Sequence, residues 1–239
     1  MMEAAMATKE NKELKTGIDQ FMKNLCRYMQ DSQEELSRYR SWNHCYEQFQ
    51  SAFKKRKTDR DMLCLWLAWY LASWGMLHNS MLLSFNYKIH APIVNIILDM
   101  DKKSLKTLNN LECQNWLDNK DDCQKKLADL YYKIRDCYEK LGVSGTDTLV
   151  TKVLLGTLGC VPAFDNLFKN GISGKSSWHR RTLASDYLTV LSKFYVKYEK
   201  AIGKACMSIK LSHAFMNPQM KIFPEMKILD MGFWKKFDK

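Results

Sequence analysis

The feature that most constrains the fold is the stretch from Tyr131 to Phe168, where two periodic apolar runs flank a pair of glycines. The segment Leu141-Gly142-Val143-Ser144-Gly145 separates the runs, and glycine adopts the positive-φ backbone that a tight turn between helices needs. The second run ends at Gly159, a typical residue just beyond a helix C-terminus. Pro162 cannot continue a helix, and the short loop around it brings Asp165 to a helix start, where a carboxylate suits the helix dipole. The stretch therefore predicts a helix, a tight turn, a helix, a proline loop and a third helix.

Composition extends the helical prediction to the whole chain. Only 10 Gly and 4 Pro occur among 239 residues, and the periodic runs show no convincing strand alternation. With 46% apolar residues the chain can bury a substantial core. We predict an all-α protein with a frayed or disordered N-terminus at 1–14 and one helical domain at 15–239. Within that domain we expect two lobes around a cleft, with an aromatic pocket in 15–100 and the hairpin and acid in 125–239.

The order L-x-G-x-G, helix, proline-containing loop and Asp resembles the helix-hairpin-helix, Gly/Pro-Asp superfamily of DNA glycosylases. In that family the amides of the hairpin hold a DNA phosphate, and the Asp is catalytic. The family's acid lies about a score of residues after the last hairpin glycine, roughly a helix of three to four turns plus a loop. Asp165 stands at that distance from Gly145, and the resemblance covers about 40 of the 239 residues.

The resemblance assigns expected roles to the matching residues. It implies that Asp165 is catalytic and that the turn binds the DNA backbone through Gly142, Val143, Gly145 and Thr146. It also implies that a monovalent cation can bind in the hairpin, with no other cofactor.

The chain departs from the family pattern at three places: the hairpin, which here is Leu-Gly-Val-Ser-Gly, the residues around the acid, and the lyase position. The usual hairpin is Pro-Gly-x-Gly and the usual acid lies in Val-Asp-Thr-His, whereas Asp165 here lies in Phe-Asp-Asn-Leu. Lyase-type members carry a nucleophilic Lys two residues after the last hairpin glycine, and that position here is Asp147. We therefore expect a monofunctional DNA glycosylase that hydrolyses the N-glycosidic bond of a flipped damaged or modified base. The resemblance implies a role in repair or in defence against phage DNA.

The most apolar segment of the chain, Asp61 to Leu83, is a candidate wall for that base. Its charge-free part is shorter than the roughly 20 residues needed to cross a bilayer, so we expect a buried helix and no membrane span. Trp66, Tyr70, Trp74 and His78 recur at every fourth position and form one stripe. Core packing is the simpler explanation of such a stripe. A pocket for a flat ring is the alternative, as base-extruding enzymes require.

Polar residues beside aromatic ones strengthen the pocket interpretation. A buried amide or imidazole needs a defined partner, and these side chains either satisfy one another or read the edge of a base. The candidate base pocket consists of Trp42, Asn43, His44, Tyr46, Trp74, His78 and Asn79.

The basic character of the chain favours a polyanionic partner. The formal net charge is +11 and the isoelectric point is near 9.2. In the glycine-containing segment 169–181, Lys175, Arg180 and Arg181 are candidate phosphate contacts, although a plain surface loop before a helix is the simpler explanation. We expect DNA as the partner and a monomeric protein.

Cysteine usage and the N-terminus indicate the compartment. The eight cysteines form no C-x-x-C pair and no zinc-ligand spacing, so we expect reduced thiols, no metal and no iron–sulfur cluster. The first 15 residues are charged and lack an apolar signal core, which predicts a cytoplasmic protein. The competing hypothesis is a non-enzymatic helical module that binds nucleic acid or protein, in which Asp165 only begins a helix.

Overall fold

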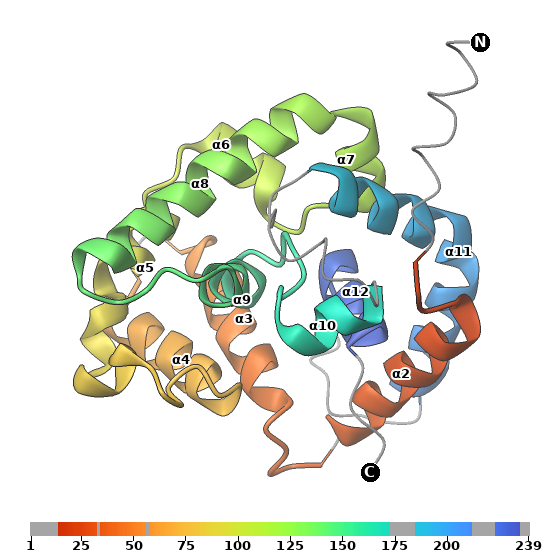
Figure 1. Ribbon diagram of the computed structural model, residues 1–239, viewed down its shortest axis with the longest axis horizontal. Coiled ribbons are helices and arrows are strands. Elements are labelled where there is room, and N and C mark those ends of the chain that lie inside the picture. Colours follow the sequence, from red (N-terminus) through yellow and green to blue (C-terminus); the bar gives the residue numbers. More distant parts are fainter. Residues whose placement is uncertain (1–13, 33, 56–57, 173–184, 212–222, 235–239) are drawn as a thin grey trace.

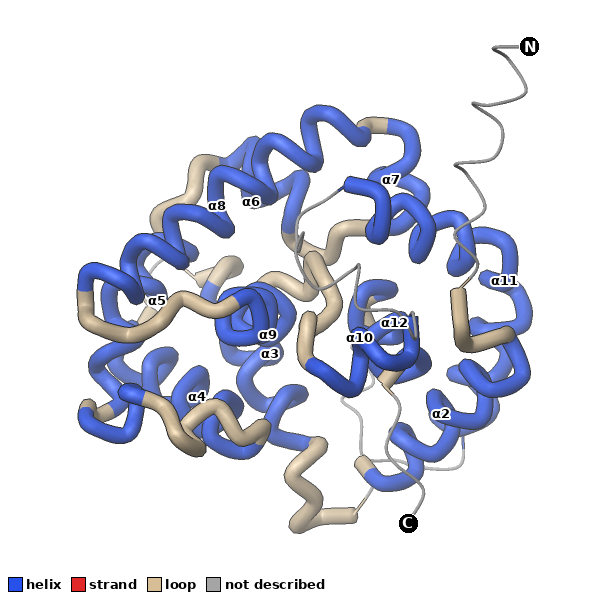
Figure 2. The backbone as a smooth tube through the Cα atoms, viewed as in Figure 1, coloured by secondary structure: helices blue, strands red, loops and turns tan. Residues whose placement is uncertain are grey.

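A computed structural model describes residues 14–32, 34–55, 58–172, 185–211 and 223–234 of the chain. Every regular element within these ranges is a helix, which confirms the all-α prediction (Figure 2). No helix in the described part of the chain is long and apolar enough to cross a bilayer. The candidate phosphate contacts Lys175, Arg180 and Arg181 lie outside the described residues.

The helices follow one another with short connections. In chain order they are α2 (Ile18–Asp31), α3 (Arg40–Ala52), α4 (Arg60–Ser73), the 3-10 helices η2 (Met81–Ser84) and η3 (Tyr87–His90), α5 (Ala91–Leu98), α6 (Lys102–Leu108), α7 (Cys113–Asp118), α8 (Lys120–Lys140), α9 (Asp147–Thr157), α10 (Asn166–Ile172), α11 (Ser185–Leu211) and α12 (Glu225–Phe233).

Helix α9 lies at the centre of the molecule. Each of its side chains from Leu149 to Thr157 is buried, and Figure 1 shows the helix nearly end-on between the surrounding helices. It packs against α3, α4 and α8, while α2 packs against α11 and α12 at the other side of the molecule. The first described helix therefore packs against the last two described helices. Chain segments that are far apart in sequence meet around α9.

The predicted turn between two helices is present after α8. Gly142 has φ +77°, and its amide and that of Val143 bond to the carbonyls of Glu139 and Tyr138, which closes the helix end. Gly145 is needed for a different reason, because a Cβ there would lie 2.8 Å from Cγ of Arg135 on α8. The two glycines thus end one helix and let the next chain segment approach it.

The single helix predicted from Asp61 to Leu83 is wrong beyond Ser73. Gly75 adopts φ +75° and its amide bonds to the carbonyl of Ala72, while the Met76 amide bonds to that of Leu71. This is the bonding of a glycine-terminated helix end. The stripe from Trp66 to His78 is consequently interrupted, and the residues after Gly75 do not continue the direction of α4.

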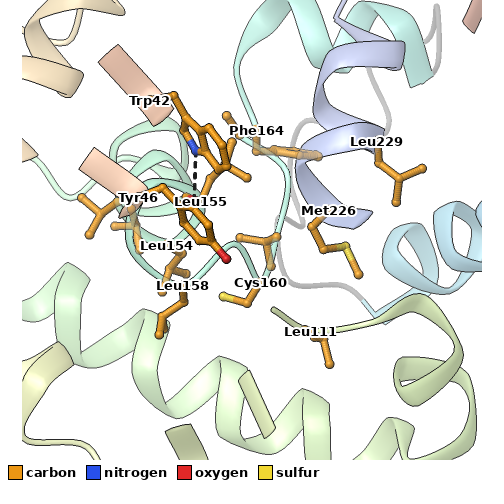
Figure 3. Close-up of a cluster of buried hydrophobic side chains, with 14 of the residues drawn as sticks. Trp42, Tyr46, Leu111, Leu154, Leu155, Leu158, Cys160, Phe164, Met226 and Leu229 are labelled. Carbon is orange, nitrogen blue, oxygen red and sulfur yellow. Dashed lines mark hydrogen bonds between the residues drawn. The ribbon is translucent and has the colours of Figure 1, made fainter. Parts of the chain in front are cut away.

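The core around α9 is filled by aromatic and aliphatic side chains from α3, α9, the following loop and α12 (Figure 3). Trp42 is fully buried, stacks on Tyr46 with ring centroids 4.7 Å apart, and donates its indole N–H to the Leu155 carbonyl at 3.1 Å. The eight cysteines are all free thiols, as expected, and six of them are buried.

Candidate functional site

The loop after α9 holds Asp165 in place through bonds to two helices. The Thr151 hydroxyl accepts the Phe164 N–H at 2.8 Å, and the Thr148 hydroxyl donates to the Phe164 carbonyl at 3.1 Å. From the other side, the Asp230 carboxylate on α12 accepts the Ala163 N–H at 2.9 Å. The backbone on the N-terminal side of Asp165 is thus bonded to α9 and α12.

Asp165 directly precedes α10, as the sequence predicts. One carboxylate oxygen, Oδ1, accepts the Phe168 N–H at 2.9 Å, as an N-cap residue does. The other, Oδ2, lies 3.3 Å from Nζ of Lys152 on α9. The Asp165 side chain keeps 16% of its surface exposed, whereas that of Lys152 keeps 4%. Lys152 also donates to the Trp74 carbonyl at 3.3 Å.

A second ion pair lies on α12. Nζ of Lys227 is 2.8 Å from Oδ2 of Asp230 and donates to the Tyr28 hydroxyl at 2.9 Å. Both charged side chains are almost completely buried. Burial lowers the pKa of Lys227 and raises the pKa of Asp230, because water no longer stabilises either charge.

Trp74 connects the two ion pairs. Its ring lies 5.3 Å from Nζ of Lys152 and 5.5 Å from Nζ of Lys227. Tyr28 stacks parallel to it at 6.0 Å, and Trp234 meets it edge-on at 5.9 Å. We call this group the charged aromatic cluster; its members are Tyr28, Tyr39, Trp74, Trp234, Lys152, Asp165, Lys227 and Asp230.

Of the candidate base-pocket residues, the structure brings Trp42 and Trp74 together at this cluster. Nζ of Lys227 lies 5.1 Å from the Trp42 ring and 5.5 Å from the Trp74 ring. Tyr46 lies next to Trp42 but is a core residue, and its hydroxyl bonds to the Asn110 side chain. Trp74 is therefore the candidate-pocket residue that borders Lys152, the partner of Asp165, whereas Trp42 borders Lys227.

The four polar candidates lie elsewhere. His44 is exposed and its ring is 5.7 Å from that of Trp66, while Asn43 is half-buried on the same helix. His78 and Asn79 are exposed after the end of α4 and contact each other at 3.3 Å. None of the four residues has a bond or ring contact with Asp165 among the described residues, and for His78 and Asn79 the break at Gly75 is the reason.

The hairpin residues use their amides within the protein. The amides of Gly142 and Val143 close α8, and the Thr146 amide donates to the Ser144 carbonyl at 2.9 Å. The Gly145 amide donates to Oε1 of Glu139 at 2.9 Å. A phosphate can reach that amide only if the Glu139 carboxylate moves away.

The residue in the position of the family's lyase Lys has a partner of its own. Asp147, in the first turn of α9, accepts a hydrogen bond from the Tyr131 hydroxyl. It is therefore not one of the carboxylates in the charged aromatic cluster.

Sequence reasoning missed Lys152, Lys227 and Asp230. A signal was present, because each stands inside an apolar helical run, LVTKVLL or EMKILDMGF, where a charge needs a buried partner. Spacing alone does not show that α9 and α12 bring these charges to one place.

In the described part of the chain, no group of three His, Cys, Asp or Glu side chains could hold a metal ion. No protein-family model, curated protein or solved structure matches the chain. The site must therefore be interpreted from its own chemistry. A partly exposed carboxylate can stabilise a positive charge that develops on a bound molecule once the neighbouring ammonium group has moved away from it.

Proposed function

We propose that this protein is a monofunctional DNA glycosylase in which Asp165 is the catalytic residue. The observation that carries the proposal is the placement of one partly exposed carboxylate, fixed at the start of α10, beside Lys152 and Trp74. Groups that are already held in place stabilise a transition state better than mobile ones. The bond from the Phe168 amide and the bonds of the preceding loop hold the Asp165 carboxylate in place, which supports the proposal.

The proposed reaction begins when the target nucleotide leaves the base stack and its ring enters the site. The N-glycosidic bond breaks, and the base leaves with the bonding electron pair. Oδ2 of Asp165 stabilises the cationic sugar and accepts a proton from the water that adds at C1′. Because Oδ2 faces Lys152 at 3.3 Å, the ammonium group must shift as the sugar binds.

DNA binding is part of the proposal, and the basic character of the chain supports it. We expect affinity to fall steeply with salt, because Lys and Arg release counterions when they neutralise phosphates. Replacing Lys175, Arg180 and Arg181 together should flatten that dependence. A purified protein that ignores DNA at low salt would contradict the DNA-binding proposal.

The direct test measures abasic sites in DNA that carries damaged, mismatched or phage-type modified bases, revealed by alkaline strand cleavage. Asp165→Asn should lower base release by orders of magnitude and leave DNA affinity unchanged, because the carboxylate acts on charge that develops in the transition state. Asp129→Asn, an exposed position on α8, is the matched control and should keep full activity. Equal activity of the Asp165 variant on a cleaved substrate would remove this residue from the mechanism.

Borohydride trapping tests whether the enzyme is monofunctional. We expect no Schiff-base adduct, because Asp147 replaces the family's lyase Lys and Lys152 is engaged by Asp165 and the Trp74 carbonyl. Strand breaks should then require added alkali. An adduct that disappears in Lys152→Met would instead make Lys152 a nucleophile.

A second candidate is a non-enzymatic module that binds nucleic acid or protein. The observation in its favour is that Asp165 has two structural partners, the Phe168 amide and Lys152. These bonds explain why an acid stands at this position without any substrate. The hairpin amides bond to acceptors within the protein, which also favours this candidate. DNA binding without release of any tested base would favour this candidate.

A further inference from the structure

The charged aromatic cluster has more free hydrogen-bond donors than acceptors. The indole nitrogens of Trp74 and Trp234 are buried, and neither N–H has an acceptor among the described residues. By contrast, each oxygen of Asp165 and Asp230 already faces a backbone amide or an ammonium group. Buried donors normally have partners, so two without one indicate a place where an acceptor binds.

Arg38 lies next to the cluster and adds a third cation around the Trp74 ring. Around the Trp74 ring lie Nζ of Lys152 at 5.3 Å, Nζ of Lys227 at 5.5 Å and Cζ of Arg38 at 5.3 Å. The two carboxylates of the cluster balance only two of these three cations. The Trp74 ring could attract a positively charged ligand, but three cations of the protein already lie around it.

Solvent reaches the cluster beside Trp74. The Trp74 and Asp165 side chains are partly buried, and the Arg38 side chain is exposed while its guanidinium lies over the rings of Trp74 and Tyr39. Arg38, Trp74 and Asp165 are therefore the side chains at this site that solvent reaches.

We infer that this site takes an uncharged ring bearing carbonyl or ring-nitrogen acceptors, as in an oxo-pyrimidine or oxo-purine, and discriminates against a cationic N-alkylated base. The acceptors of such a ring satisfy the indole N–H groups of Trp74 and Trp234. A cationic ring instead meets the excess positive charge and finds no free acceptor. This inference rests on the proposed function, since it names the substrate class of the same site.

The test compares two duplexes whose 2′-fluoroarabino sugars resist hydrolysis, one carrying hypoxanthine and the other N7-methylguanine, which is positively charged. Binding of the full chain is measured by fluorescence anisotropy against a duplex with neither lesion. The hypoxanthine duplex should bind roughly tenfold more tightly than the N7-methylguanine duplex.

Two variants separate the donor and the charge contributions. Trp234→Phe keeps an aromatic ring and removes the N–H, so hypoxanthine binding should fall roughly tenfold. Arg38→Gln removes an exposed cation, so N7-methylguanine binding should improve. Trp69→Phe, an exposed position on α4, is the matched control and should change neither. Trp74→Phe replaces the first variant if thermal melting shows that Trp234→Phe does not fold.

The outcomes distinguish this inference from the proposed function. Equal binding of both lesions, tighter binding of N7-methylguanine, or binding of neither above the unmodified duplex would overturn the inference, whether or not the protein releases a base. Selective binding of hypoxanthine without base release from the natural-sugar duplex would support the substrate class and contradict the glycosylase proposal.

Discussion

The two Lys–Asp pairs of the charged aromatic cluster use the same residue types in different surroundings. Lys227 and Asp230 lie 2.8 Å apart and are almost completely buried, and both carboxylate oxygens and the ammonium have close partners. Lys152 and Asp165 lie 3.3 Å apart, and Asp165 keeps 16% of its side-chain surface exposed. The first pair joins α12 to α2 and to the loop after α9, whereas the second lies where that loop meets solvent.

The difference in burial separates charges that stabilise the fold from charges that a ligand can reach. A buried pair with every hydrogen-bonding group engaged cannot lose one member without leaving a charge in a dry site. A longer pair at the edge of the same cluster can open at a smaller cost, because water and a ligand reach it. We therefore assign a structural role to Lys227 and Asp230 and propose a catalytic one for Asp165.

The largest expected effect follows from breaking the buried pair. Lys227→Met should lower the free energy of unfolding by about 3–5 kcal/mol at neutral pH, because Asp230 is left as an unpaired buried charge. The measurement is urea unfolding followed by circular dichroism. Lys88→Met removes an exposed partner of Asp61 and should leave stability nearly unchanged.

A double variant checks this reason. Lys227→Met with Asp230→Leu should recover most of the lost stability, since no charge then remains buried. If Lys227→Met alone has no more effect than Lys88→Met, the buried pair does not hold the fold together.

The next prediction concerns the pH dependence of stability. His90 is buried and titratable and belongs to neither Lys–Asp pair. Its Nδ1 is 2.8 Å from the Tyr138 hydroxyl, and burial lowers its pKa from 6.5 to about 4. The unfolded chain binds a proton more readily in this window, so stability should fall as the pH decreases from 6.5 to about 4, by about 3 kcal/mol in total.

The control for acid unfolding is another histidine. His90→Gln should flatten the pH dependence of the unfolding free energy, whereas His78→Gln, at an exposed position, should not. An unchanged pH profile in His90→Gln would mean that the buried His90 does not govern the loss of stability in acid.

A smaller effect concerns the loop that carries Asp165. Thr151→Val removes the acceptor of the buried Phe164 amide, so the free energy of unfolding should fall by about 1–2 kcal/mol. Base release should fall by roughly tenfold or more, because the carboxylate loses its fixed position. Thr157→Val is the matched control, since that buried hydroxyl bonds only within α9. Similar base release by both variants would show that the Thr151 bond does not position Asp165.

The parts of the fold that depend on local rules could be predicted from the sequence. Gly142 and Gly159 adopt positive φ where helices end, and Asp165 caps the next helix, because these preferences act within a few residues. The break of α4 is also local, but its signal, Gly75, lies in an apolar run that reads as one continuous helix. The helical spacing therefore predicts one helix across Gly75, although this glycine ends α4 in the structure.

The charged aromatic cluster depends on tertiary packing, which sequence spacing does not specify. Lys227 bonds to the hydroxyl of Tyr28, 199 positions away in the chain, and Trp74 contributes to the cluster from beyond the end of α4. The exposed positions of His78 and Asn79 follow from the same helix break. Burial of Lys152 could be suspected from its apolar neighbours, but its partner Asp165 could not be identified from them.

The contrast between the pairs is tested most directly by making the same substitution in each, Asp165→Asn and Asp230→Asn, and measuring unfolding free energy and base release for both. Asp165→Asn should cost clearly less than Asp230→Asn, because Asn retains much of the capping ability and the carboxylate it replaces is partly exposed, while base release falls by orders of magnitude. Asp230→Asn should cost about 3–5 kcal/mol, because Lys227 remains buried without its counter-charge. An Asp165→Asn protein that is as destabilised as Asp230→Asn, or that still releases base at the parent rate, would contradict the account.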